Sequence, residues 1–180
     1  MFASAAPPPP VVAAPPPIKL WGQAAQYMTP GEVLGLYPAA TPATPAVLVD
    51  GAQARLSYTT TLSTGPAQVV FYFRGDELDA VLVHVLDVKP GEGGGLQTAR
   101  GLRDTLARTY GPPTAQAEAD DAGLRSLNAQ WTRQPLKVSL GYQDVGGRRE
   151  TLWVAFRAWD WNRHLPTPPR RFIKGSVRRG

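Results

Sequence analysis

The sequence predicts an α+β fold in which an antiparallel sheet carries two helices. Two segments with helical apolar spacing, 29–37 and 96–110, are each followed by several segments that alternate like β-strands. Each helical segment ends at prolines, which lack the backbone donor that a continuing helix needs. Because a helix followed by a meander of strands occurs twice, we expect two related halves within one domain.

The first helix has a complete start signal. Thr29 can cap the helix, Pro30 occupies the first helical position, and Glu32 completes a capping box three residues after Thr29. Val33 then begins the apolar face. Pro38 prevents the helix from continuing, so the next residues are expected to cross to the first strand as an extended connection.

Three strands are expected after this helix, over 52–62, 68–74 and 78–87. The last two are joined by a short hairpin loop. Because 68–74 and 78–87 carry apolar residues on both sides, we expect them in the middle of a sheet that is covered on both faces. A helix could cover one face, and the other half of the domain or a second chain could cover the other.

The second helix carries its apolar side chains on one face at helical spacing. They are Ala99, Leu102, Leu106 and Tyr110. Gly111, Pro112 and Pro113 end the helix. The acidic stretch 118–121 is expected to be a loop. Three strands with clear alternation follow, over 127–133, 136–142 and 151–158.

Composition divides the chain into three parts. Residues 1–17 contain seven prolines and are expected to form a disordered arm, either a semi-rigid spacer or a peptide-recognition segment. Residues 18–162 are expected to form the single α+β domain. Residues 163–180 contain six Arg or Lys and no Asp or Glu, which predicts a basic flexible tail.

The net charge of +5 lies entirely in that tail, because residues 1–162 carry thirteen basic and fourteen acidic side chains. Clustered cations are what attachment to phosphates or anionic headgroups requires. The alternative is an unstructured, solubilising end. The candidate anion-binding residues are Arg170, Arg171, Lys174, Arg178 and Arg179.

The compartment is predicted from the first residues. Ala3-Ser4-Ala5 resembles the small-residue tripeptide that ends a signal peptide, although only two residues precede it. We expect an exported, periplasmic protein, and a cytosolic location is the alternative. The chain has no cysteine, which rules out disulfides and thiolate metal sites in either compartment.

The sequence shows no catalytic or cofactor motif. Of its two histidines, His84 lies between leucines on a predicted strand and His164 lies in the tail. The glycines at 91–95 are not followed by the Lys and Ser/Thr of a phosphate-binding loop, and Arg74-Gly75-Asp76 fits a hairpin turn. We therefore expect no enzyme, no cofactor and no metal.

The last strand provides the candidate partner-binding residues. Its even-numbered positions, Leu152 to Ala158, are apolar and are expected to face the core. Trp153, Arg157 and Trp159 lie on the opposite face, and Trp and Arg are the residue types enriched at binding hot spots. The alternative is that the tail or the N-terminal segment folds back over these residues.

The order of elements resembles the small exported domains of the BLIP-like and BamE/SmpA type. The residues that carry the resemblance are Gly22, Met28-Thr29, Glu32-Val33, Tyr37-Pro38 and Tyr110-Gly111-Pro112. It covers residues 20–158, and the chain departs from the lipoprotein members because it lacks a lipidation cysteine. The resemblance implies a domain that binds other proteins or envelope components through its sheet.

These observations favour a non-enzymatic envelope protein that binds or scaffolds another protein through the face bearing Trp153 and Arg157. A homodimer is a second possible assembly. The alternative function is the binding of an anionic polymer or surface, either nucleic acid or lipid headgroups, through the basic tail.

Overall fold

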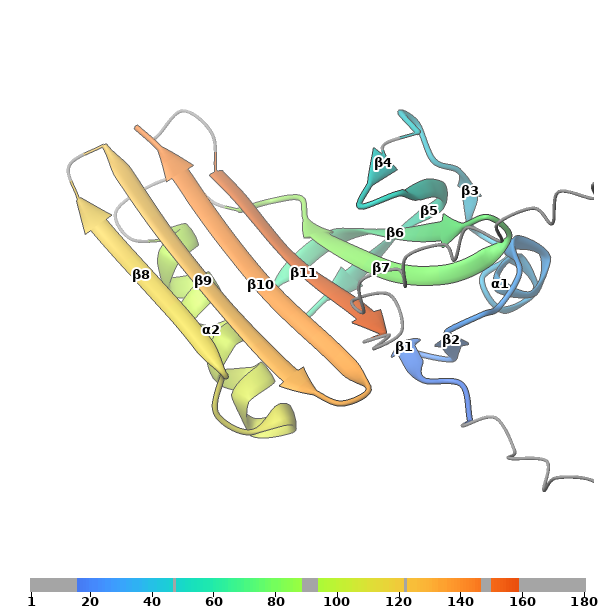
Figure 1. Ribbon diagram of the computed structural model, residues 1–180. Coiled ribbons are helices and arrows are strands. Elements are labelled where there is room, and N and C mark those ends of the chain that lie inside the picture. Colours follow the sequence, from blue (N-terminus) through green and yellow to red (C-terminus); the bar gives the residue numbers. More distant parts are fainter. Residues whose placement is uncertain (1–15, 47, 89–93, 122, 147–149, 159–180) are drawn as a thin grey trace, which may run out of the picture.

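The computed structural model describes residues 16–46, 48–88, 94–121, 123–146 and 150–158 (Figure 1). These residues form one large antiparallel sheet, a separate two-stranded sheet and two helices. The elements follow in the order β1 (Lys19–Trp21), β2 (Ala24–Ala25), α1 (Pro30–Leu36), β3 (Thr41–Pro42), β4 (Leu48–Val49), β5 (Ala52–Leu62), β6 (Gly65–Arg74), β7 (Glu77–Val85), α2 (Gly94–Tyr110), β8 (Ala115–Asp121), β9 (Leu124–Arg133), β10 (Leu136–Val145) and β11 (Glu150–Ala158).

The predicted α+β class is wrong, because the protein is mostly β. Strands hold 56% of the described residues and helices hold 18%. Segments that we expected to be connections or loops are paired strands instead: β3 and β4 pair with β5, and β8 pairs with β9. Two further short strands, β1 and β2, pair with each other. The two helices are short, with 7 and 17 residues.

The large sheet has nine strands in the described part of the chain. Eight follow the order β3-β5-β6-β7-β11-β10-β9-β8, and β4 also pairs with β5. The chain leaves β7 in the middle of the sheet, passes through α2 and returns at the far edge with β8. Three hairpin steps then bring β11 back beside β7. Strand direction turns strongly between β8 and β5, as expected for a twisted sheet (Figure 1).

The first helix begins as the sequence predicts. Thr29 is its N-cap, and both hydrogen bonds of the capping box with Glu32 are present. The second helix covers the predicted segment and ends at Tyr110, before Gly111. It buries Leu96, Ala99 and Leu106 against the sheet. Neither helix in the described ranges combines the length and the apolar character needed to span a membrane.

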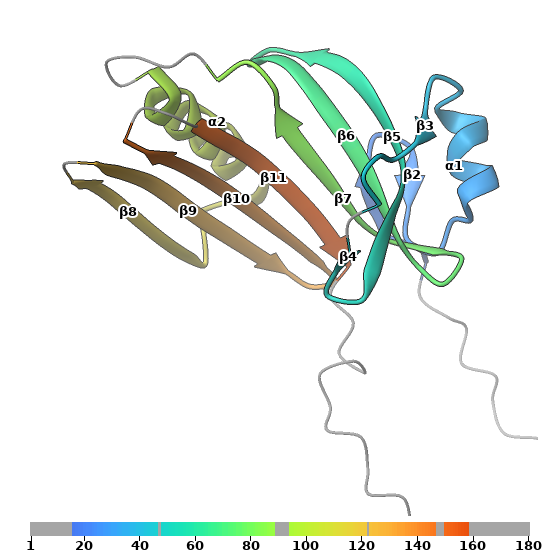
Figure 2. The same cartoon turned by 90° about the horizontal axis from the view of Figure 1, so that it is seen from above.

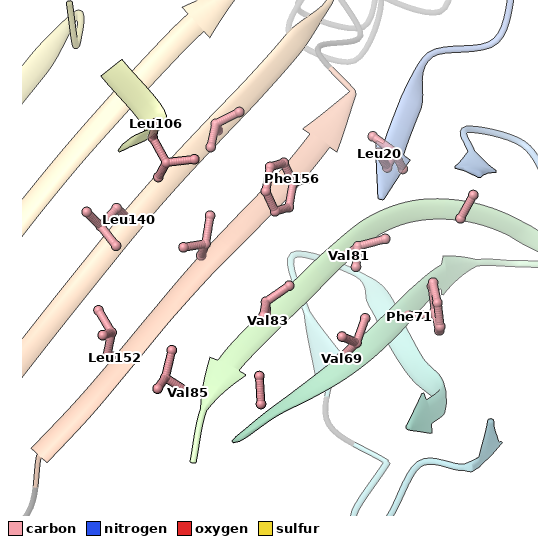
Figure 3. Packing of buried hydrophobic residues seen from close by; sticks show 14 of the residues in the cluster. Leu20, Val69, Phe71, Val81, Val83, Val85, Leu106, Leu140, Leu152 and Phe156 are labelled. Atoms are coloured by element: carbon pink, nitrogen blue, oxygen red, sulfur yellow. The ribbon is translucent and has the colours of Figure 1, made fainter. Parts of the chain in front are cut away.

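One face of the sheet, the covered face, carries the main core. The helix α2 lies along one side of β9 to β11 (Figure 2). Residues from α1, β1 and β2 join the same core, because Val33, Leu20 and Ala24 are buried in it. Leu20 lies near Val81 and Phe156, and Leu106 lies near Leu140 (Figure 3). This single continuous cluster holds both halves of the sheet together.

Aromatic side chains reinforce the covered face. The ring of Tyr37 stacks on that of Tyr58 and also contacts Phe71. Trp131 is fully buried, and its indole N–H donates a 2.8 Å hydrogen bond to the carbonyl of Gly111. That bond ties the end of α2 to β9 and satisfies the one polar atom of this large side chain.

The opposite face, the open face, carries no helix among the described residues. A smaller apolar cluster lies over β5 to β7 and consists of Ala52, Ala54, Val70, Tyr72 and Ala80. Ala43, from the segment between β3 and β4, packs against it. This cluster explains why β6 and β7 carry apolar residues on both faces. Among the described residues, the cover on this face is the short segment that contains Ala43.

Strand β8 shows why the acidic stretch was misjudged. Its side chains are mostly exposed because it is an edge strand, so it lacks the apolar alternation that identifies an inner strand. Glu118 forms ion pairs with Arg100 and Arg103 of α2. Backbone pairing with β9 and the ion pairs to α2, rather than an apolar side, hold this strand in place.

Candidate functional site

The most distinctive part of the open face is a row of side chains that crosses four strands. Gly141 of β10, Trp153 of β11, His84 of β7 and Gln68 of β6 are direct cross-strand partners. Trp153 and His84 are both half-buried. Trp153 is the large aromatic residue at the centre of this row.

The missing side chain at Gly141 makes room for the indole of Trp153. A Cβ atom added there would overlap the indole ring and would lie 2.8 Å from its Nε1. The indole therefore lies over the backbone of β10. The Trp153 N–H forms no hydrogen bond within the described residues, although the buried indole of Trp131 has its acceptor. Trp153 thus presents a ring and a donor to whatever approaches this face.

A hollow of about 330 Å³, which we call the apolar hollow, lies on one side of Trp153. Its walls are mainly apolar and come from Tyr72, Ala80, Leu82 and Ala155. The polar residues that line it are Asp50, His84, Lys137, Ser139 and Arg157. A mostly apolar concavity with a few polar groups is the usual form of a binding pocket.

A charged network closes one end of the apolar hollow. Arg157 donates a 2.7 Å hydrogen bond to Asp50, which lies in the turn between β4 and β5. Arg157 Nε also lies 3.8 Å from the buried Asp79, and Arg74 lies 3.5 Å from the same carboxylate. Arg74 donates a further hydrogen bond, at 2.6 Å, to the backbone carbonyl of Asp50.

This network fixes the turn that borders the hollow. Asp50 and Gly51 have positive φ angles of 48° and 76°, which Asp-Gly sequences adopt in tight hairpins. The hydrogen bond from Arg157, together with its charge, lowers the pKa of Asp50 below its ordinary value. Asp50 is therefore charged at neutral pH and holds the Arg157 guanidinium at the rim of the hollow.

A second hollow, of about 350 Å³, lies on the other side of Trp153. Its lining is mostly apolar, and we call it the polar hollow after its uncharged polar side chains. It extends over β8, β9 and β10, and its side chains include Asn128, Gln130 and Ser139. Trp153 and Ser139 line both hollows. No charged residue lines the polar hollow among the described residues.

His84 has none of the surroundings of a catalytic histidine. Burial lowers its pKa, so its imidazole is neutral at neutral pH. No hydrogen bond or ion pair to His84 occurs in the described part of the chain. Within the same residues, no group of three or more His, Asp or Glu side chains could hold a metal ion.

A second polar cluster lies on the covered face, at the end of the sheet near the start of α2. Arg125 donates to Asp144 at 3.0 Å through Nε, and Tyr142 donates to Glu150 at 3.2 Å. Burial is the main cause that raises the pKa of Tyr142 to about 12, and the nearby Glu150 adds to it. Because these side chains lie on the covered face, they do not line either hollow.

The structure places two of the three candidate partner-binding residues. Trp153 and Arg157 lie on the open face of β11, with Ala155 between them on the same face. Trp159 lies outside the described residues, as do the candidate anion-binding residues Arg170, Arg171, Lys174, Arg178 and Arg179. Their roles stay predictions.

Sequence reasoning missed most of the lining of both hollows. Asp50 is 107 residues away from Arg157 in the chain, so no local pattern joins them. Asn128 and Gln130 belong to a predicted strand, and they alternate with its apolar residues. That alternation was the one sequence feature that could have placed them on the open face. Only the strand order shows that they lie beside Trp153.

Comparisons with known protein families, with curated proteins and with solved structures found no significant match. The resemblance to BLIP-like and BamE/SmpA-type domains therefore rests only on the short motifs in the sequence.

Proposed function

We propose that this protein is a non-catalytic binding domain that holds a partner protein against the open face of its sheet. In this proposal the apolar hollow receives an apolar side chain of the partner. The observation that carries the proposal is that Trp153 and Arg157 line a mostly apolar hollow on a face that carries no helix among the described residues.

The physical support comes from what the hollow offers to a protein surface. An inserted side chain would exchange water for contacts with Tyr72, Leu82 and Ala155. Trp and Arg are two of the three residue types that are enriched at the hot spots of protein interfaces. Because Asp50 and Asp79 already position Arg157, little side-chain entropy would be lost when it contacts a partner.

An envelope location belongs to the same proposal. It is supported by Ala3-Ser4-Ala5 and by the resemblance to exported domains. The alternative function, binding of an anionic polymer or surface, depends on tail residues outside the described ranges, and no described contact favours it.

A photocrosslinking experiment tests the proposal. A photoreactive phenylalanine analogue replaces Leu82, in the wall of the apolar hollow, and a control protein carries it at the exposed Gln97 of α2. We expect a partner that crosslinks in cells at position 82 and not at 97. The partner is then purified, and its affinity is measured for the wild type, Trp153→Ala and Arg157→Ala.

The expected result is a loss of affinity of about tenfold or more in Trp153→Ala, and a smaller loss in Arg157→Ala. The Gln97→Ala variant should bind like the wild type. The proposal fails if no protein crosslinks selectively at position 82, or if a folded Trp153→Ala protein keeps the wild-type affinity.

A further inference from the structure

We propose that the polar hollow is a carbohydrate-binding site, in which a neutral oligosaccharide stacks one sugar ring on the indole of Trp153. This inference concerns the opposite side of Trp153 from the apolar hollow. The two hollows share Trp153 and Ser139, but their other lining residues differ, so a sugar in the polar hollow does not require a partner side chain in the apolar hollow.

The first argument is the shape and chemistry of the platform. The indole lies over Gly141, so its ring extends across β10 toward the polar hollow that it lines. The face of an aromatic ring is electron-rich and attracts weakly positive groups. A pyranose ring presents a flat face of C–H groups of this kind, and its contact with an indole is apolar as well as weakly electrostatic.

The second argument is the set of hydrogen-bonding groups around that platform. Asn128, Gln130 and Ser139 line the polar hollow and carry amide and hydroxyl groups that both donate and accept. No hydrogen bond within the described residues uses the side chains of Asn128 or Ser139. The amide of Gln130 donates to Thr132 at 3.2 Å, which holds the Gln130 side chain in place. Sugar hydroxyls need partners of this mixed kind.

The third argument is the small size of the neighbouring side chains. Ala115 and Ala117 of β8 also line the hollow. Ala115 is the cross-strand partner of Gln130, and Ala117 is that of Asn128. Small residues leave the strand backbones accessible and make the hollow broad. The hollow lies at the edge of the sheet, since β8 is its last strand in the described chain. A long chain of sugars could therefore enter and leave without meeting a wall.

The charge of the site favours a neutral sugar over a nucleic acid. No charged side chain lines the polar hollow among the described residues, and nucleic-acid binding depends on clustered Lys and Arg. Two cations of the open face that the structure describes, Lys137 and Arg157, line the apolar hollow instead. Arg157 is held there by Asp50.

Titration calorimetry with purified full-length protein tests the proposal. The probes are three neutral hexasaccharides, namely cellohexaose, chitohexaose and maltohexaose, together with a single-stranded oligothymidylate. We expect at least one hexasaccharide to bind and the oligonucleotide not to bind. Trp153→Ala should weaken the sugar affinity about tenfold or more, and Trp153→Phe should weaken it less because an aromatic ring remains.

Three further variants separate this site from a general loss of structure. Asn128→Ala and Gln130→Ala should each weaken the sugar about threefold, since each removes hydrogen bonds but leaves the platform in place. Gly141→Ala should weaken it as well, because the added Cβ displaces the indole. Gln97→Ala on α2 should have no effect. Circular dichroism melting confirms that each variant is folded.

The proposal is overturned if none of the three hexasaccharides binds, or if a folded Trp153→Ala protein binds them as the wild type does. It is also overturned if the oligothymidylate binds and Trp153→Ala abolishes that binding, since the ligand class would then be nucleic acid. A failure of the sugars leaves the crosslinking result at Leu82 unaffected, so the two proposals fail separately.

Discussion

The two faces of the large sheet are built from the same strands but carry different chemistry. On β11, Leu152, Val154 and Phe156 are buried on the covered face. Trp153 and Arg157 alternate with them and stay half-buried on the open face. The covered face packs against α1, α2 and the small sheet of β1 and β2. The open face has the two hollows.

The difference shows how one sheet can separate stability from binding. Burial of apolar area is the dominant favourable contribution to folding, and here most of it lies on the covered face. The residues of the open face are less constrained by the core. They can therefore include Gly141, the half-buried ring of Trp153 and the amide side chains beside it without loss of the fold.

The largest expected effect concerns the covered face. Trp131→Ala removes a fully buried indole and its hydrogen bond to Gly111. We expect the free energy of unfolding to fall by about 3–5 kcal/mol. Urea unfolding followed by circular dichroism measures it. A loss below about 1 kcal/mol would show that the covered face does not dominate stability.

A smaller effect on stability is expected from Tyr142 at alkaline pH. The pKa of Tyr142 is raised to about 12, so its phenol stays protonated in the folded state where the unfolded chain ionises near the ordinary value of 10. Its contribution to stability is full below pH 10 and is lost as the pH rises toward 12. We expect Tyr142→Phe to remove the latest step of a tyrosinate absorbance titration and to reduce the alkaline sensitivity of unfolding.

Exposed Tyr27 provides the control for that titration. Tyr27→Phe should leave the step assigned to Tyr142 in place. The account of Tyr142 would be contradicted if the latest step persisted in Tyr142→Phe.

The smallest expected effect lies on the open face. Because Arg157 lowers the pKa of Asp50, the pair contributes stability above the ordinary value of 3.8, and the contribution is lost as the pH falls through the lowered pKa. The pair is exposed, so Asp50→Asn should lower the melting temperature by only about 1–2 °C at neutral pH and by less in acid. Differential scanning calorimetry at the two pH values checks it. A large loss would mean that the open face contributes to stability as the covered face does.

The sequence was informative where a local pattern determines the structure. The capping box at Thr29 and Glu32 needs only four residues, and the inner strands have apolar alternation that a buried face requires. It failed where tertiary pairing decides. Strand β8 is stabilised by its neighbour β9 and by ion pairs of Glu118. Its own residues lack apolar alternation, so the sequence alone predicts a loop there. That error contributed to the wrong fold class.

The candidate site shows the same division. Alternation along β11 was enough to place Trp153 and Arg157 on one face. The other residues that line the hollows come from β4, β6, β7, β8, β9 and β10 and from the turn after β4, and no local pattern gives that strand order. Only the strand order of the sheet therefore shows that Asp50 and Asn128 belong to the site.

The most direct test of the division between the two faces is a paired measurement on Trp153→Ala. The unfolding free energy and the affinity for the partner captured at Leu82 are measured on the same preparation. We predict a stability loss of about 1 kcal/mol or less, far below that of Trp131→Ala, together with an affinity loss of about tenfold or more. A Trp153→Ala protein that loses as much stability as Trp131→Ala, or that keeps the wild-type affinity, would contradict the account.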